Sequence, residues 1–183
     1  MSRVVLVSNR VLDLRKAAQA GGVAVALADI VRTRPSLWFG WNGDIKPVEE
    51  ANTVMRDGRV VTVPLTQAEH DRYYLGYSNS VLWPVFHNRL DLAQFEAGYF
   101  DQYIGVNRRF AAALQPMLQP DDIIWVHDYH LIPLAIELRM LGVQNRIGFY
   151  LHIPFPPWQT FIAIPEHEHL ARCLAAYDLI GLQ

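Results

Sequence analysis

Cysteine is nearly absent from this chain of 183 residues, because Cys173 is the only one. A single cysteine excludes an internal disulfide framework and any zinc site built from several cysteines, and we expect Cys173 to be a small buried apolar residue. An excess of either charge is absent too, since 16 Lys and Arg against 18 Asp and Glu leave a net charge of −2. This balance argues against a nucleic acid or an anionic membrane surface as a partner.

Long apolar runs are also missing, so the sequence contains no candidate for a membrane span. The few residues before the first apolar run are too short for a signal peptide. We therefore expect a soluble, cytoplasmic protein without a membrane partner. At 51% hydrophobic residues the chain can still bury a sizeable core. Its oligomeric state stays open, with a homo-oligomer as one option.

Short apolar runs without polar alternation recur along the chain, which is typical of strands buried on both faces of a parallel sheet. The predicted strands are residues 4–7, 38–41, 123–126, 146–151 and 179–182. Helical periodicity predicts helices at residues 23–31, 66–77, 91–118 and 166–175, the third with a break near Gly105. This alternation indicates an α/β fold with a doubly wound, mostly parallel, Rossmann-like sheet. No linker or repeat divides residues 1–183, so we expect one domain.

Local signals refine this prediction at several points. Asp57-Gly58 between strand-forming residues predicts a β-hairpin. Thr66 followed by Glu69 three residues later predicts a capping box at the start of a helix. Residues 42–44 predict a turn that ends the second strand. Residues 166–169 read as a solvated helix start with no functional role.

Polar clusters stand directly after three predicted strands, at residues 8–10, at residues 127–130 and at His152. In open α/β sheets ligands collect beyond the carboxyl ends of the strands, so these clusters are candidate site residues. Arg10 can hold a phosphate through two parallel hydrogen bonds. A surface arginine paired with an acid is an equally good interpretation of Arg10.

Gly21 and Gly22 precede the predicted helix 23–31. Backbone N–H groups at a helix N-terminus favour an anion, and glycine allows its close approach, so this pair is a candidate phosphate cradle. An ordinary tight loop explains the pair equally well. The chain lacks the G-x-G-x-x-G dinucleotide fingerprint, which disfavours a nicotinamide cofactor.

Three residues that follow a predicted strand, His127, Asp128 and His130, also allow a metal site of a hydrolase. No second ligand set of matching spacing accompanies them, so this alternative ranks lower. A carboxylate such as Asp128 has a more specific use, because it accepts hydrogen bonds from two sugar hydroxyls at once.

Aromatic side chains provide the other surface that sugars need, an apolar face for the ring with polar groups at its edge. Trp41, Tyr73, Tyr74 and Trp83 are the candidates. For Trp38 and Trp125 we expect only core packing.

Together these segments resemble the trehalose-6-phosphate synthases, retaining glucosyltransferases built from two Rossmann-like domains. The matching blocks follow in order over nearly the whole chain: residues 4–10, 21–22, 37–43, 73–74, 78–84, 86–87, 122–130 and 146–156.

The resemblance implies transfer of glucose from UDP-glucose to glucose 6-phosphate with retention of the α configuration. It assigns the acceptor's phosphate to Arg10 with Tyr74 beside it, and the acceptor's hydroxyls to Asp128. Retention without an obvious carboxylate nucleophile suggests attack on the face from which UDP leaves, so the protein positions substrates and stabilises the departing phosphate. The catalytic candidates are Asp128 and His152.

The resemblance also assigns the donor side and the selectivity of the site. The Gly21-Gly22 loop approaches the donor diphosphate, and His152 lies against the donor sugar. Trp83 and Ile153 border the acceptor and bear on anomer choice, and Trp41 is a further candidate for substrate contact. The chain has no Asp-x-Asp pair, which glycosyltransferases commonly use to chelate a metal-bound diphosphate, so we expect neither a metal nor another cofactor.

The chain departs from the family pattern in two respects. The loop from Arg10 to Gly21 is basic, with Arg15 and Lys16, and slightly short for bacterial members. Residues 1–183 are expected to form only the N-terminal, acceptor-side domain, without the domain that binds the nucleotide sugar. The chain alone should then show little transferase activity and should expose an apolar face. Alternatives are a relative with another acceptor (a glucosylglycerol-phosphate synthase or a pseudo-glycosyltransferase) and a non-catalytic sugar-phosphate-binding or regulatory domain.

Overall fold

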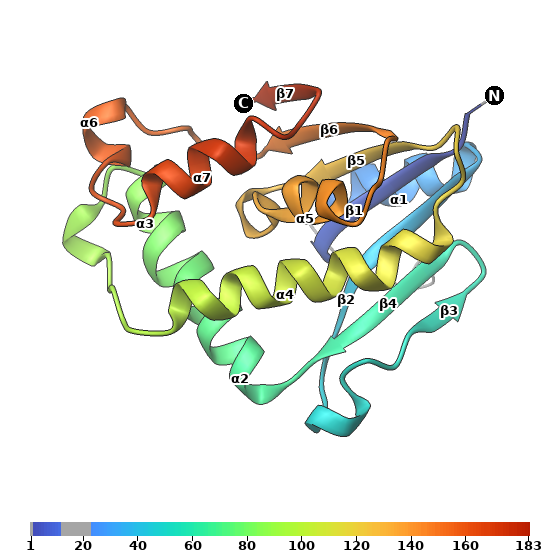
Figure 1. Ribbon diagram of the computed structural model, residues 1–183, viewed down its shortest axis with the longest axis horizontal. Coiled ribbons are helices and arrows are strands. Elements are labelled where there is room, and N and C mark those ends of the chain that lie inside the picture. The colour runs from blue at the N-terminus through green and yellow to red at the C-terminus, as the bar shows by residue number, and fades with distance from the viewer. Residues whose placement is uncertain (1, 12–22) are drawn as a thin grey trace.

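A computed structural model describes residues 2–11 and 23–183 and shows a layered α/β arrangement around one sheet (Figure 1). In the described part of the chain the strand order is β3-β4-β2-β1-β5-β6-β7, and every neighbouring pair is parallel apart from β3 and β4. The strands are β1 (Val4–Arg10), β2 (Ser36–Ile45), β3 (Met55–Asp57), β4 (Val60–Leu65), β5 (Ile123–His127), β6 (Arg146–Leu151) and β7 (Leu179–Leu182). The predicted fold class is confirmed.

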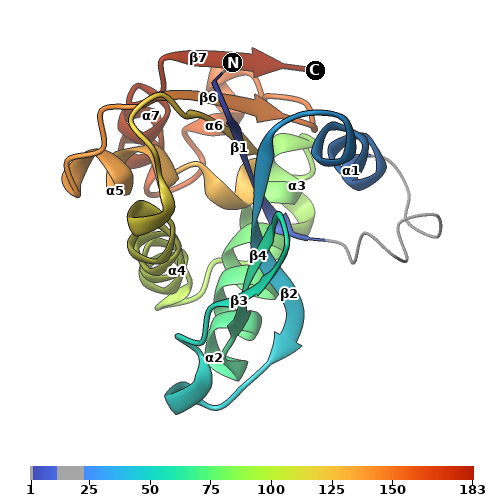
Figure 2. The same cartoon turned by 90° about the vertical axis from the view of Figure 1, so that its right-hand side faces the viewer.

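Helices cover both faces of the sheet. They are α1 (Val23–Thr33), α2 (Gln67–Glu69), α3 (Trp83–Phe86), α4 (Tyr99–Leu114), α5 (Leu134–Met140), α6 (Trp158–Phe161) and α7 (His167–Leu174). Short 3₁₀ turns lie at Val48–Glu50, Leu90–Leu92, Gln115–Met117 and Tyr129–Leu131. Figure 2 shows α1 on one side of the sheet and α4, α5 and α7 on the other. No helix among the described residues is long and apolar enough to cross a membrane.

The central strand β1 is buried on both faces, which explains its unbroken apolar run. Val5 and Val7 belong to the large core cluster shared with α4, whereas Leu6 packs with Val31 and Trp38 on the α1 side. From β1 the chain runs through α1 to β2 on one flank, and it returns later to β5 on the other flank. The strand order therefore reverses at β1 and β5, where an open α/β sheet places its ligand crevice.

The capping box is confirmed, but the helix that it starts is longer than predicted. The Thr66 hydroxyl accepts a hydrogen bond from the Glu69 N–H at 3.1 Å, and the Glu69 carboxylate accepts one from the Thr66 N–H at 2.8 Å. The helix then continues as a π-helix over His70–Leu82 and ends in α3. Long π-helical stretches are rare and often lie at functional sites.

The helix predicted over residues 91–118 is wrong in its start and in its break. It begins at Tyr99, after Gly98 with φ +83°, and it runs through Gly105 without interruption. Burial of a stripe that includes Tyr103 and Phe110 holds α4 on the sheet, and this packing outweighs the low helix propensity of Gly105.

The turn predicted at residues 42–44 is also wrong, because β2 continues to Ile45. Gly43 takes φ +93°, and the pairing of β2 with β4 shifts between Trp41 and Ile45. The glycine thus marks an irregularity within the strand and not its end. The hairpin at Asp57-Gly58 is confirmed, with Asp57 as the last residue of β3 and Gly58 in the turn.

Candidate functional site

A cavity of about 230 Å³ lies at the carboxyl ends of β1 and β5. It is lined by Ser8, Asn9, Arg10, Leu27, Tyr74, His127, Asp128, Tyr129 and His130. The predicted clusters at residues 8–10 and 127–130 are therefore brought together, and Tyr74 joins them from the π-helix. Their meeting follows from the parallel pairing of β1 with β5, which sets Ser8 opposite His127.

Arg10 ends β1 directly after a bulge, since the register with β2 shifts between Ser8 and Arg10. Its guanidinium lies 5.0 Å from the centroid of the Trp41 ring, a cation–π contact. A Cβ atom at Gly43 would lie 2.2 Å from an Arg10 nitrogen, so the absence of a side chain at Gly43 leaves room for the guanidinium. Within the described ranges Arg10 has no carboxylate partner, unlike the paired surface arginine considered from the sequence.

Two tyrosines of the π-helix meet the site in different ways. The buried Tyr73 donates its hydroxyl hydrogen bond to Asn9 Oδ1 at 2.8 Å, and this bond ties the helix to the bulge of β1. Tyr74 lines the cavity, with its ring 5.4 Å from Trp41 and 5.8 Å from His130. Of these two neighbours in the π-helix, Tyr73 is therefore bonded to β1, whereas Tyr74 faces the cavity.

Asp128 adopts an unusual backbone conformation, with φ +77° and ψ 163°. Its Oδ1 accepts hydrogen bonds from the backbone N–H groups of Tyr129 at 3.1 Å and His152 at 3.4 Å. Burial raises the pKa of the Asp128 carboxyl, while these N–H donors and the nearby His152 oppose the rise. Strained backbone of this kind clusters at functional sites, and here it aims a carboxylate into the cavity.

His130 is buried beside Asp128, between aromatic rings. Its ring stacks on Tyr129 at 4.0 Å and on Tyr74 at 5.8 Å. Both ring nitrogens lack a hydrogen-bond partner in the part of the chain that the structure describes, and burial lowers the pKa of His130 to about 3. An uncharged His130 leaves Arg10 as the cation that lines the cavity.

His152 follows β6 and lies next to the cavity, where its Nε2 is 3.1 Å from Nδ1 of His127. Burial lowers the pKa of His152, with Asp128 opposing this effect. The same burial, together with His152, lowers the pKa of His127 to about 3. Both rings are therefore neutral near pH 7.

The remaining predicted site residues lie elsewhere. Gly21 and Gly22 fall outside the described residues. Trp83 stands at the start of α3 and is 41% exposed, with its ring 4.2 Å from His87. Ile153 packs against the large core cluster, and Trp41 is buried beneath Arg10. None of these last three lines the cavity.

The side chains considered as metal ligands are not arranged as a ligand set. Among residues 2–11 and 23–183, no three His, Cys, Asp or Glu side chains lie close enough to share a metal ion. His127 is hydrogen-bonded to His152, and His130 is enclosed by rings. Cys173 is buried as predicted, and burial raises the pKa of its thiol to about 12.

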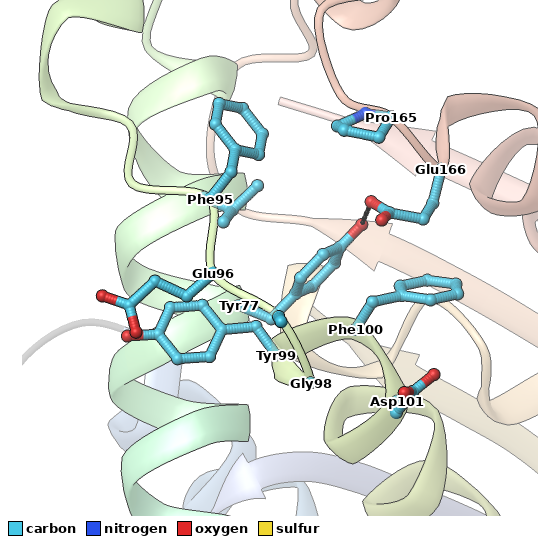
Figure 3. Close-up of a pocket in the computed structure, with 11 residues that line it drawn as sticks. Tyr77, Phe95, Glu96, Gly98, Tyr99, Phe100, Asp101, Pro165 and Glu166 are labelled. Carbon is cyan, nitrogen blue, oxygen red and sulfur yellow. Dashed lines mark hydrogen bonds between the residues drawn. The ribbon is translucent and has the colours of Figure 1, made fainter.

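A second cavity of about 350 Å³ lies between the start of α4 and the segment before α7 (Figure 3). It contains none of the predicted site residues. In it the buried Tyr77 donates a hydrogen bond to the Glu166 carboxylate at 3.0 Å. The helix start predicted at residues 166–169 is confirmed, since α7 begins at His167, but Glu166 is only partly exposed and satisfies a hydroxyl from the core.

Some residues that support the candidate site were not predicted from the sequence. Gly40 is one, because a Cβ there would lie 2.1 Å from the Ser8 carbonyl oxygen and would push β2 away from the bulge. Gly43 is another, through its close approach to the Arg10 side chain. The glycines of the W-F-G-W-N-G run were the available signal, but only the structure shows which atoms approach them.

Comparison with known proteins identifies the family. The family model described as glycosyltransferase family 20 matches residues 6–183. The chain belongs to glycosyltransferase family 20. The predicted resemblance to trehalose-6-phosphate synthases is confirmed, because this family 20 chain is 46% identical to the trehalose-6-phosphate synthase of Sodalis glossinidius and 47% identical to that of Escherichia coli O1:K1.

Solved structures of family 20 share the same fold. The chain matches an α,α-trehalose-phosphate synthase (UDP-forming) from Burkholderia xenovorans in complex with glucose-6-phosphate, with a TM-score of 0.90 and 45% identity. It also matches an E. coli structure bound with UDP-2-fluoro glucose, with a TM-score of 0.89 and 46% identity. Each match covers 100% of this chain and 40% of the other, so the family 20 chain spans about two fifths of these relatives.

Proposed function

We propose that this chain is the acceptor-side, N-terminal domain of a UDP-glucose-dependent trehalose-6-phosphate synthase, which transfers glucose to glucose 6-phosphate with retention. The observation that carries the proposal is that the Arg10 guanidinium, with no carboxylate partner in the described ranges, shares one cavity with the Asp128 carboxylate at the switch point of the sheet. The identity of about 45% to a synthase solved with glucose-6-phosphate supports this assignment of the ligand.

The acceptor's phosphate would bind at Arg10. A guanidinium offers two parallel N–H donors to phosphate oxygens, and its stacking on Trp41 together with the contact at Gly43 limits its rotation before the ligand arrives. Tyr74 stands beside it with its hydroxyl as a further polar group. A preorganised cation of this kind loses little entropy on binding, which favours affinity.

The hydroxyls of the hexose would bind at Asp128. Two backbone N–H groups hold Oδ1 in place, and Oδ2 has no hydrogen-bond partner among the described residues. The carboxylate can therefore accept hydrogen bonds from hydroxyl groups without reorganising. His152, next to it across the end of β6, would face the donor sugar, while the departing phosphate of UDP takes up the proton of the attacking hydroxyl.

A chimera provides the test. The segment of the Burkholderia xenovorans synthase that aligns with this chain is replaced by residues 1–183, and UDP release is followed with UDP-glucose and glucose 6-phosphate. We expect turnover that requires both substrates and a product identified as trehalose 6-phosphate. A chimera that folds and binds UDP yet makes no such product would contradict the proposal.

The same assay addresses two alternatives. A relative with another acceptor would turn over faster with glycerol 3-phosphate than with glucose 6-phosphate. A sugar-phosphate-binding module would bind glucose 6-phosphate, measured calorimetrically on the 183-residue chain, but would not support turnover in the chimera. The chain by itself should release little or no UDP, because it supplies only one wall of the proposed cleft.

A further inference from the structure

His127, at the end of β5, and His152, directly after β6, form a direct hydrogen bond between their rings. The surroundings of the two rings indicate which nitrogen donates the proton. His127 lies opposite Tyr150 in the register of β5 and β6, so His152, two residues further, projects from the same face. The rings lie 5.3 Å apart with an interplanar angle of 23°, and Nδ1 of His127 is 3.1 Å from Nε2 of His152.

His127 is uncharged at neutral pH. Only 2% of His127 is exposed, and its ring lies against Trp125 at 4.7 Å. Burial, with a smaller contribution from His152, lowers the pKa of His127 to about 3. At neutral pH His127 therefore carries a single N–H, on either Nδ1 or Nε2.

The surroundings of Nε2 decide between these two positions. Nε2 of His127 is buried and has no hydrogen-bond partner within residues 2–11 and 23–183. If the proton were on Nε2, a buried N–H donor would have no acceptor. If the proton is on Nδ1, Nε2 is an acceptor without a donor. Buried N–H groups without a partner are rarer in proteins than acceptors that are not fully satisfied. The proton on Nδ1 can instead be donated to Nε2 of His152.

We infer that His127 is a positioning residue that donates its Nδ1–H to His152 and thereby holds His152 in the tautomer with its proton on Nδ1. His152 then presents an N–H donor, and not an acceptor, to the substrate. Its partner would be an oxygen acceptor, a hydroxyl or phosphoryl oxygen of the sugar nucleotide, and this part rests on the proposed function. The tautomer itself does not depend on it.

Nitrogen NMR of the ¹⁵N-labelled 183-residue chain at pH 7 tests the tautomer directly. Long-range ¹H–¹⁵N spectra distinguish protonated from bare ring nitrogens, and substitution of each histidine assigns its signals. We expect both His127 and His152 to carry the proton on Nδ1. A protonated Nε2 on His152 in the unsubstituted chain would overturn the inference, and this readout needs no active enzyme.

Two substitutions of His127 separate positioning from packing. His127→Asn keeps an N–H donor close to the position of Nδ1 and should retain the Nδ1–H form of His152. His127→Phe keeps a ring without a donor and should move the His152 proton to Nε2, the form preferred by free histidine in water. An unchanged His152 tautomer in a folded His127→Phe chain would refute the role of His127. Should that variant not fold, the unsubstituted spectrum decides alone.

Activity of the chimera provides the functional readout. His127→Phe should lower kcat/KM for UDP-glucose about tenfold, the effect of one hydrogen bond, with a smaller effect on KM for glucose 6-phosphate, whose proposed cavity His127 also lines. His127→Asn should retain most of the kcat/KM that the unsubstituted chimera shows with UDP-glucose. An inactive parent chimera would count against the proposed function alone, whereas an active chimera indifferent to His127→Phe would count against this inference alone.

Discussion

At the scale of single residues, two charged side chains of opposite sign line the cavity, Arg10 and Asp128. The histidines around them, His127 and His130, are kept neutral near pH 7 because burial lowers the pKa of each to about 3. On the proposed function, the Arg10 guanidinium would bind the anion and the Asp128 carboxylate would accept hydrogen bonds from hydroxyls. This division of labour makes both side chains separately testable.

Arg10→Ala should weaken binding of glucose 6-phosphate to the chain about tenfold to a hundredfold, the range expected for charge-assisted hydrogen bonds. Arg146→Ala is the matched control, because Arg146 is exposed at the opposite, amino end of β6. Titration calorimetry on both variants checks this prediction. An equal loss for the two, or no loss for either, would show that Arg10 does not hold the phosphate.

Asp128→Asn should weaken glucose 6-phosphate binding about tenfold or more, because the neutral amide loses the charge that strengthens the hydrogen bonds from the hydroxyls. The same variant should melt at a higher temperature at pH 7. Burial raises the pKa of Asp128, so its ionised form lowers the free energy of unfolding at any pH above that folded-state pKa.

The raised pKa of Asp128 predicts how the stability difference between the two proteins depends on pH. As the pH falls through the folded-state pKa, Asp128 takes up its proton, and the advantage of asparagine should disappear below the pKa of the unfolded state. Asparagine also tolerates the positive φ at this position, so the backbone cost is unchanged. Thermal melts of both proteins between pH 3 and 7 measure the difference, and a constant difference would contradict the assignment.

At the scale of elements, the end of β2 shapes the site through glycine. Gly43, with φ +93°, leaves room for the Arg10 guanidinium, so a strand irregularity and the side chain proposed to bind phosphate depend on each other. Gly58 in the β3–β4 turn has φ +60°, but a Cβ added there would meet no atom within 4 Å, which makes it a natural control.

Gly43→Ala and Gly58→Ala should each lower the free energy of unfolding by about 1–2 kcal/mol, because both place alanine at positive φ. Only Gly43→Ala should also weaken glucose 6-phosphate binding, since the new methyl group displaces the Arg10 side chain. Denaturant melts and calorimetry on the pair separate the two effects. Unaffected binding in Gly43→Ala would mean that Arg10 binds from another position.

At the scale of the whole molecule, the edge strand β7 leaves apolar side chains in contact with water. Leu179 is 72% exposed and Leu182 is 55% exposed. Ile180 and Leu182 also border an apolar depression of about 150 Å³ with Phe86 and Phe155. An unpaired apolar edge of this kind favours association between copies.

The chain should therefore self-associate as its concentration rises. Leu179→Lys with Leu182→Lys should shift the mass measured by light scattering toward the monomer. Val48→Lys serves as the control, because Val48 is equally exposed at 72% but lies in the 3₁₀ turn after β2, on the part of the sheet farther from β7 in the strand order. A monomeric unsubstituted chain, or an equal response to the control, would contradict this prediction.

Much of the architecture could be predicted from local patterns. Unbroken apolar runs predict buried parallel strands. β1 is buried on both faces, whereas β5 and β6 carry half-buried residues between their buried ones. Polar residues directly after those runs predict the site, because parallel strands all end at the same edge. The family resemblance then supplied roles that spacing alone does not contain, as for His152.

Other features were decided only by tertiary contacts. Gly105 stays inside α4 because the packed stripe of that helix outweighs a local propensity, and the helix after Thr66 widens into a π-helix whose Tyr73 bonds to Asn9 on a distant strand. The hydrogen bond between His127 and His152 likewise depends on the register of β5 with β6. Local sequence determines which elements form, whereas the partners of a side chain depend on how those elements pair, which no short segment encodes.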